Sequence, residues 1–244
     1  MTELIHLNSL HLNYLSPLLK WRVMDLESLR RECFQIPKYK NFYRVIRNLE
    51  KKKVLEGYRD PFSKKKFIYL SPLGESQLSI RENTNALSKD TLLHDIKVSE
   101  IVRALLEQNL IVNAELEHQI HDKKTFNNDF GITPDAVLYL EKHGKKIKAA
   151  LELELTRKSN QRITEKARQY LDSSFYQKII YVFSQKELMK KYQEVLLEKF
   201  GDDIIKRIHF FYHPELTFKP TNFESVVTYI DGHQMSLKDF FIPK

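Results

Sequence analysis

The sequence predicts a mixed α/β protein built from two modules, and three observations support this prediction. The chain has 244 residues, which is enough for one large domain or two modest ones with a real core. Its hydrophobic content of 42% and aromatic content of 11% are typical of a folded globular protein. Helical periodicity dominates residues 9–53, whereas strand-like apolar runs alternate with helical segments after residue 108.

The positive charge of the chain is concentrated in its first third. The formal net charge is +8, from 40 Lys/Arg against 32 Asp/Glu. Residues 1–80 hold 15 Lys/Arg and eight Asp/Glu, a balance of +7, which leaves 25 against 24, or +1, for the other 164 residues. This division favours two modules with different partners, the first of them facing a polyanion. A basic surface that serves only solubility is the alternative.

Three helices and a hairpin are expected in the N-terminal module, residues 1–80. The helices span residues 9–21, 26–34 and 39–53, with Asp25 as the N-cap of the second and Pro37 as the break before the third. The hairpin follows in two short apolar runs that flank Asp60-Pro61, a pair typical of a turn.

The third helix separates an apolar stripe from a basic one at helical spacing. The apolar positions are Phe42, Val45, Ile46 and Leu49, and the basic positions are Lys40, Arg44, Arg47 and Lys51. Three more lysines, Lys64, Lys65 and Lys66, follow the hairpin turn. These elements in this order resemble a winged helix-turn-helix domain over residues 10–80. The resemblance implies that the basic helix positions enter the major groove of double-stranded DNA and that the three lysines contact phosphates. Winged-helix domains also bind proteins, and a merely solvated basic face stays the alternative.

A second module is expected over residues 92–244, after a polar linker at residues 81–91. Its expected elements are, in chain order, a helix (92–108), three strands (110–117, 135–141 and 146–155), a helix (161–172), a strand (178–184), a helix (186–200) and two strands (206–213 and 225–230). Strands grouped around intervening helices predict a mixed α/β domain.

Three carboxylates are expected to gather at one end of a hairpin in this module. His143-Gly144 is a good two-residue turn, which pairs residue 142 with 145 so that opposed residue numbers sum to 287. Asp135 then lies across from Glu152, and Glu154 shares their face, away from the more apolar layer. Opposed like charges destabilise a sheet unless they are neutralised, and Mg²⁺ does this well because it accepts one or two carboxylates.

Pro134-Asp135, the hairpin and Glu152-Leu153-Glu154 resemble the motif of the PD-(D/E)XK nuclease-like superfamily. The expected element order fits the core of that superfamily as well. The resemblance implies Mg²⁺ or Mn²⁺ held by Asp135, Glu152 and Glu154, and hydrolysis of a DNA phosphodiester bond by a metal-activated water. Position 154 is Glu where the motif has Lys, so Lys158 and Lys166 are the candidates for the assisting lysine. Lys166 is better placed if its helix packs over the site, with Arg162 and Tyr170 on the same face.

The whole combination resembles the replication-relaxation family of bacterial mobile elements. Besides the N-terminal module, the resemblance rests on the helix that begins Leu93-His94-Asp95, on Pro134-Asp135-Ala136 and on residues 151–156. It implies a DNA-binding protein of plasmid replication, relaxation or mobilisation, with other proteins of those processes as partners. It also makes His94 a candidate neighbour of the carboxylates. Winged-helix proteins often dimerise, so a homodimer is a further expectation, although no heptad marks an interface.

Two versions of this function stay open at the level of the sequence. In one the protein is an endonuclease, and in the other it is a catalytically silent scaffold that acts as a winged-helix transcriptional or replication regulator. A transcription factor with a ligand-sensing second domain is less favoured because no ligand motif is present. The lone Cys33 excludes a disulfide framework, and no Gly-rich phosphate loop occurs among only six glycines. With no signal peptide and no run of ~20 apolar residues, we expect a cytoplasmic protein without a membrane partner.

Overall fold

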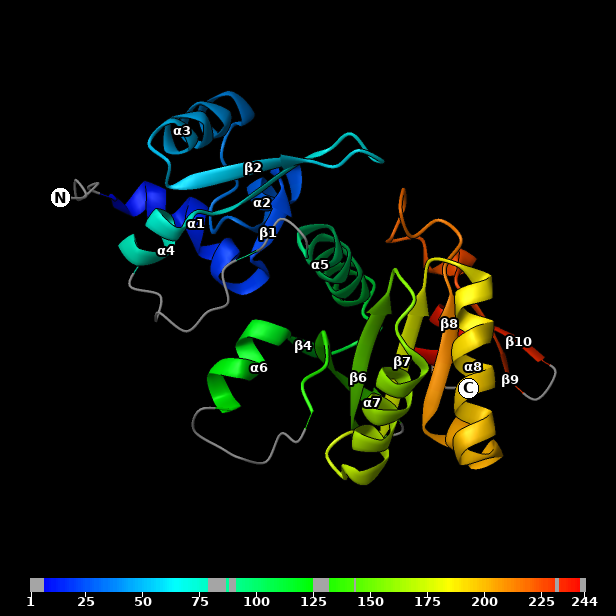
Figure 1. Ribbon diagram of the computed structural model, residues 1–244. Coiled ribbons are helices and arrows are strands. Elements are labelled where there is room, and N and C mark those ends of the chain that lie inside the picture. Colours follow the sequence, from blue (N-terminus) through cyan, green and yellow to red (C-terminus); the bar gives the residue numbers. More distant parts are fainter. Residues whose placement is uncertain are drawn as a thin grey trace. The chain divides into compact units, whose positions relative to one another are not determined.

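The computed structural model describes residues 7–78, 87, 91–124, 132–142, 144–230 and 233–241. The chain divides into two compact units, residues 1–99 and 100–244. The division falls inside helix α5 (Leu92–Glu107) (Figure 1). The sequence placed the linker earlier, at residues 81–91, most of which lie outside the described residues. The first turns of α5 therefore group with the first unit.

The first unit combines short helices with a small antiparallel sheet. Its elements before α5 are α1 (Ser9–Trp21), β1 (Val23–Asp25), α2 (Leu26–Glu32), α3 (Tyr39–Lys51), β2 (Leu55–Arg59), β3 (Lys66–Leu70) and α4 (Pro72–Gln77). The strand order is β1-β3-β2, with Val23 paired to Tyr69 and Leu55 to Leu70. The three expected helices and the hairpin are present, and β1 and α4 are additional.

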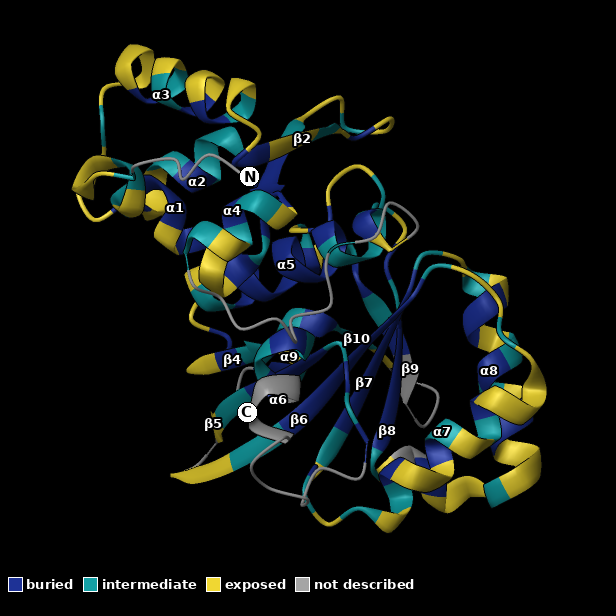
Figure 2. Cartoon of the chain, turned by 60° about the vertical axis from the view of Figure 1, so that its left-hand side comes forward, coloured by how far each residue is buried: buried dark blue, intermediate teal, exposed yellow. Residues whose placement is uncertain are grey.

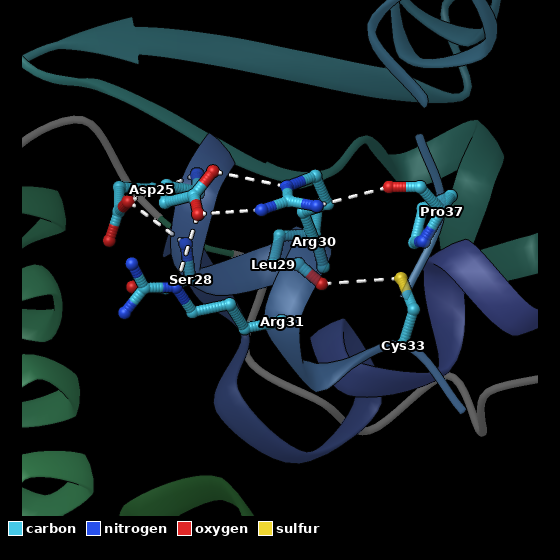
Figure 3. A network of polar contacts seen from close by, with 8 residues as sticks. Asp25, Ser28, Leu29, Arg30, Arg31, Cys33 and Pro37 are labelled. Atoms are coloured by element: carbon cyan, nitrogen blue, oxygen red, sulfur yellow. Dashed lines mark hydrogen bonds and ion pairs between the residues drawn. The ribbon is translucent and has the colours of Figure 1, made fainter. Parts of the chain in front are cut away.

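Hydrogen bonds of two side chains explain where α2 begins and how it is connected to α3. Asp25 caps α2 by accepting hydrogen bonds from the backbone N–H groups of Glu27 and Ser28, each at 3.1 Å, as the sequence predicts for an N-cap. Figure 3 shows that the Arg30 guanidinium of α2 reaches the segment between α2 and α3. Its Nη1 donates a hydrogen bond to the carbonyl oxygen of Pro37 at 3.1 Å. The segment that precedes α3 is thereby tied to α2.

The second unit is built on a seven-stranded mixed sheet. Its strands are β4 (Asn113–Leu116), β5 (Ala136–Lys142), β6 (Lys145–Glu154), β7 (Lys178–Phe183), β8 (Ile208–Tyr212), β9 (Val227–Ile230) and β10 (His233–Ser236), and their order is β10-β9-β8-β7-β6-β5-β4. Its helices after α5 are α6 (Glu117–Lys124), α7 (Asn160–Asp172), α8 (Lys186–Phe200) and α9 (Leu237–Phe241), with short 3-10 turns at Asp202–Lys206 and Phe223–Ser225. The strand pairs β6–β7 and β7–β8 are parallel and the others antiparallel. The mixed α/β fold class is thus confirmed.

The central strands of this sheet are buried on both faces, which Figure 2 shows as dark blue ribbons at β6, β7 and β8. On one face, Val137, Ala150 and Tyr181 form a cluster with residues of α7 and α8. On the other face, Ala149 and Leu151 are also buried. The carboxylate-bearing face is therefore no less buried than the opposite one, because two helices that follow β6 and β7 return across it (Figure 1).

Across the described ranges, none of the helices combines the length and the apolar character that crossing a bilayer requires.

Candidate DNA-contacting face and carboxylate site

Helix α3 presents a basic face to solvent. Phe42, Ile46 and Leu49 are buried, and Val45 is partly buried. The four basic positions of the other face, Lys40, Arg44, Arg47 and Lys51, are all exposed, and Figure 2 shows the outer side of α3 in yellow. Among the described residues, none of these four has an acidic partner within 4.0 Å. Their charge is therefore available to an external anion.

A groove of about 680 Å³ follows the exposed side of α3. Besides the four cations, its lining contains two amides, one aromatic ring and one aliphatic side chain, namely Asn41, Asn48, Tyr43 and Val45. The Tyr39 and Tyr43 rings stack at 5.9 Å, and the Arg47 guanidinium lies 5.8 Å from the Tyr43 ring. Charge spacing alone did not identify Asn41, Tyr43 and Asn48. The available signal was the interval of three or four that separates Asn41 and Asn48 from Arg44, and the interval of four between Tyr43 and Arg47.

The β2–β3 hairpin carries the other predicted DNA contacts. Lys64 and Lys65 are exposed at its tip, and Lys64 has a positive φ of 59°. Lys66, the first residue of β3, is different, because its Nζ lies 2.7 Å from Glu50 Oε1 on α3. This ion pair connects the β2–β3 hairpin to α3. It also neutralises the charge of Lys66.

In the second unit, the β5–β6 register places Asp135 next to Glu152. Ala136 pairs with Leu151 and Lys142 with Lys145, so the expected sum of 287 holds throughout the hairpin. Asp135 precedes the first pair, and its Oδ2 accepts a hydrogen bond from the Leu153 N–H at 2.7 Å. The half-buried Asp135 and the buried Glu152 therefore sit at the same end of the hairpin.

Glu152 is engaged by two donors from α7. Lys166 Nζ contacts its Oε2, and the Tyr170 hydroxyl donates to its Oε1. Burial, with the nearby charge of Asp135, raises the pKa of Glu152 to about 7, although Lys166 and Tyr170 act in the opposite direction. Burial also acts against a charged Lys166, but the carboxylates of Glu152 and Asp135 outweigh it and raise the pKa of Lys166. Lys166 is thus a proton donor held in its ammonium form.

Glu154 has a separate partner. Lys158 Nζ lies 3.1 Å from its Oε1 and 3.0 Å from its Oε2, and the Glu154 side chain is only 2% exposed. Both lysines that the sequence singled out therefore contact carboxylates, each a different one. Arg162 takes no part in these contacts with Glu152 and Glu154. It is exposed on α7, the helix that carries Lys166. His94, in the first unit, lies 3.7 Å from Asp95 through its Nδ1.

The donor types of this cluster suit a hard divalent cation, but only in part. Mg²⁺ and Mn²⁺ favour carboxylate oxygens and keep several waters, so Asp135 and Glu152 suffice as protein ligands. Both oxygens of Glu152 already accept hydrogen bonds, and Glu154 is turned to Lys158. Within the described part of the chain, no three acidic, His or Cys side chains converge with the geometry of a metal site. A cation here would use two carboxylates and displace Lys166 from Glu152.

An open pocket of about 400 Å³ reaches this cluster from solvent. It is lined by Ile132, Thr133, Lys158, Arg162, Glu165, Lys166 and Gln169. Three cations against one carboxylate give the pocket a positive lining. An anionic ligand would therefore approach the carboxylates between Lys158 and Lys166.

Comparison with known protein families identifies the family of this chain. The model of the replication-relaxation family matches residues 15–179, which is more than half of the sequence and includes both the basic face and the carboxylate cluster. The chain belongs to the replication-relaxation family. Among curated proteins, no sequence matches it.

One solved structure with detectable similarity is that of the restriction endonuclease FokI bound to DNA. The match has 12% identity and a TM-score of 0.26, and it covers 85% of this chain and 43% of that one. The chain thus spans less than half the length of FokI, and a likeness at this TM-score carries no argument about fold or function.

Proposed function

We propose that this member of the replication-relaxation family binds double-stranded DNA through its N-terminal unit, which acts as a winged helix-turn-helix domain in replication, relaxation or mobilisation of its element. The observation that carries the proposal is the face of α3 on which Lys40, Arg44, Arg47 and Lys51 are exposed together. A helix fits the major groove of B-DNA, and Lys/Arg side chains neutralise its phosphates. Lys64 and Lys65 extend the same charge to the hairpin.

Binding of a fluorescent duplex, followed by anisotropy at fixed salt, tests this proposal. The variant Arg44→Ala/Arg47→Ala should weaken binding by at least about tenfold, because two cations leave the groove. Lys190→Ala/Lys199→Ala removes the same charge from exposed positions of α8 and is the matched control. Equal weakening by both pairs would show that only net charge matters and would refute a role for α3.

We also propose that the second unit holds one Mg²⁺ or Mn²⁺ through Asp135 and Glu152 and cleaves a DNA phosphodiester bond. The register that brings the two carboxylates together under Lys166 favours this second function. The metal would supply Lewis-acid charge and lower the pKa of a bound water. Lys166 would contribute positive charge beside the phosphate. Tyr170 would hold Glu152 in place.

Calorimetric titration with Mn²⁺, together with plasmid nicking by the same samples, separates the endonuclease from a silent scaffold. Binding and nicking should both be present in the wild type and both be lost in Asp135→Ala/Glu152→Ala. Lys158→Ala should leave Mn²⁺ binding intact, because Lys158 pairs with Glu154 and not with Glu152. A wild type that binds duplex DNA but neither binds Mn²⁺ nor nicks would instead be a regulator that uses this unit as a scaffold.

A further inference from the structure

A buried ion pair lies beneath the hairpin tip of the first unit. Lys97 Nζ, on α5, is 3.2 Å from Asp60 Oδ2 at the end of β2, and the two side chains are 1% and 0% exposed. Removing two charges from water is costly, and apolar side chains of similar volume often serve stability as well or better. The pair is therefore poorly explained as a stabilising device alone, and its position indicates another role.

Asp60 organises the whole hairpin tip. Its Oδ1 accepts from the Phe62 N–H at 3.0 Å and its Oδ2 from the Ser63 hydroxyl at 2.6 Å. Its backbone N–H donates to the Lys65 carbonyl, and its carbonyl accepts from the Lys64 N–H, each at 3.0 Å. The two exposed lysines of the tip are thus bonded directly to the backbone of Asp60. Any displacement of Asp60 would move both of them.

Lys97 stands on a rigid support. The first turns of α5 pack on the small sheet, where Leu92 and Ile96 form a buried cluster with Val23, Phe67 and Tyr69. The hydroxyl of Ser99 also donates to the Val23 carbonyl at 3.3 Å. The Lys97 ammonium is accordingly fixed relative to the sheet, while the hairpin tip extends beyond the paired residues Arg59 and Lys66.

We propose that Asp60 and Lys97 form a buried clasp that holds Lys64 and Lys65 in the position in which they contact DNA phosphates. Both are positioning residues, since neither is exposed to the nucleic acid. A hairpin tip without the clasp would keep its two charges but present them from many positions, and each contact would then cost conformational entropy. The inference rests on the proposed DNA binding by the first unit.

A double-mutant cycle on duplex affinity tests the clasp. The wild type is compared with Lys64→Ala/Lys65→Ala, with the neutral pair Asp60→Asn/Lys97→Met, and with all four changes combined. In the wild-type background, loss of the two lysines should weaken binding by about tenfold at low salt. Without the clasp the same loss should cost less than about twofold, because the lysines no longer meet phosphates in a fixed position.

Two results would overturn the clasp. Equal losses in both backgrounds would show that the lysines act independently of it, and no loss in the wild type would show that the tip does not contact DNA. In both cases the effect of Arg44→Ala/Arg47→Ala would persist, whereas its absence would refute the proposed DNA binding itself.

If the variant Asp60→Asn/Lys97→Met does not fold, Ser63→Ala provides a second test of the clasp. It removes the bond from the Ser63 hydroxyl to Asp60 Oδ2 and a 3.4 Å bond from the Lys65 N–H to that hydroxyl, while both charges of the ion pair are kept. Amide hydrogen exchange at Phe62 and Lys64 should accelerate in this variant, and the contribution of Lys64 and Lys65 to affinity should fall in parallel. Faster exchange with an unchanged contribution would contradict the clasp.

Discussion

At pH 9, where Glu152 with its pKa of about 7 is ionised, replacing Lys166 by Met should destabilise the second unit by leaving the Glu152 carboxylate buried without its cation. Glu152 is 1% exposed, and removing one partner of a fully buried pair costs about 3–5 kcal/mol. Lys166 keeps 28% of its side chain exposed, so water compensates part of this loss and we expect the lower end, about 3 kcal/mol. For a unit of this size, that corresponds to a fall in Tm of roughly 6–12 °C.

Thermal denaturation followed by circular dichroism, with a chelator present, measures this effect. Lys206→Met is the matched control, because Lys206 pairs with Asp203 while both side chains stay largely exposed, at 76% and 85%. It should leave Tm nearly unchanged, because water screens an ion pair this exposed. The double variant Glu152→Gln/Lys166→Met should recover part of the loss, since no buried charge remains. Equal small effects of Lys166→Met and Lys206→Met would refute the account of Glu152 as a buried carboxylate neutralised by Lys166.

Three further predictions concern stability. Gly74→Ala should lower the free energy of unfolding in urea by at least about 2 kcal/mol, because its Cβ would lie 2.2 Å from the Val54 carbonyl oxygen. Gly144→Ala should lower it by only about 1 kcal/mol, because Gly144 has a φ of +73° but no described atom within 4 Å of the added Cβ. Leu49→Ala, at a fully buried position of α3, should cost about 3 kcal/mol, and the partly buried Val45→Ala clearly less; similar costs would contradict the assigned faces of α3. Burial, aided by the charge of Lys178, lowers the pKa of His209 from 6.5 to about 4, so the folded protein resists protonation that the unfolded chain accepts. The contribution of His209 to stability, measured as the difference between the wild type and His209→Gln, should therefore fall by up to about 3 kcal/mol as pH drops from 6.5 to 4; a difference that does not change with pH would contradict this assignment.

The sequence predicted best those features that depend on local chemistry. Asp25 caps α2 as expected from its position, and the expected pairing of residue 142 with residue 145 gives the register that brings Asp135 to Glu152. Both candidate lysines lie at carboxylates. Lys166 contacts Glu152 because the spacing of α7 places Lys166 and Tyr170 on one face, whereas Lys158 precedes α7 and contacts Glu154.

Features that depend on tertiary packing were not predicted. The three-residue strand β1 has no pattern of its own and exists through its pairing with β3. The start of α5 looked like the beginning of the second module, but Leu92 and Ile96 pack on the sheet of the first unit. The burial of Glu152 was not predicted either, because a carboxylate between apolar residues of a strand does not indicate which helix will cover it.

The sequence suggested a cation as the neutralising agent for the carboxylates, and the structure offers protein groups as well. Lys166 and Tyr170 satisfy Glu152, Lys158 satisfies Glu154, and a backbone N–H satisfies one oxygen of Asp135. Each of the three carboxylates therefore has a protein partner, and the titration with Mn²⁺ tests whether a cation binds in addition.

The salt dependence of duplex binding tests the central claim most directly. The slope of log affinity against log salt should be shallower by about 2 for Arg44→Ala/Arg47→Ala than for the wild type, since each lost phosphate contact contributes about 0.9. The Lys190→Ala/Lys199→Ala control should keep the wild-type slope. An unchanged slope in the α3 variant, or no salt-dependent binding in the wild type, would contradict DNA binding through the basic face of α3.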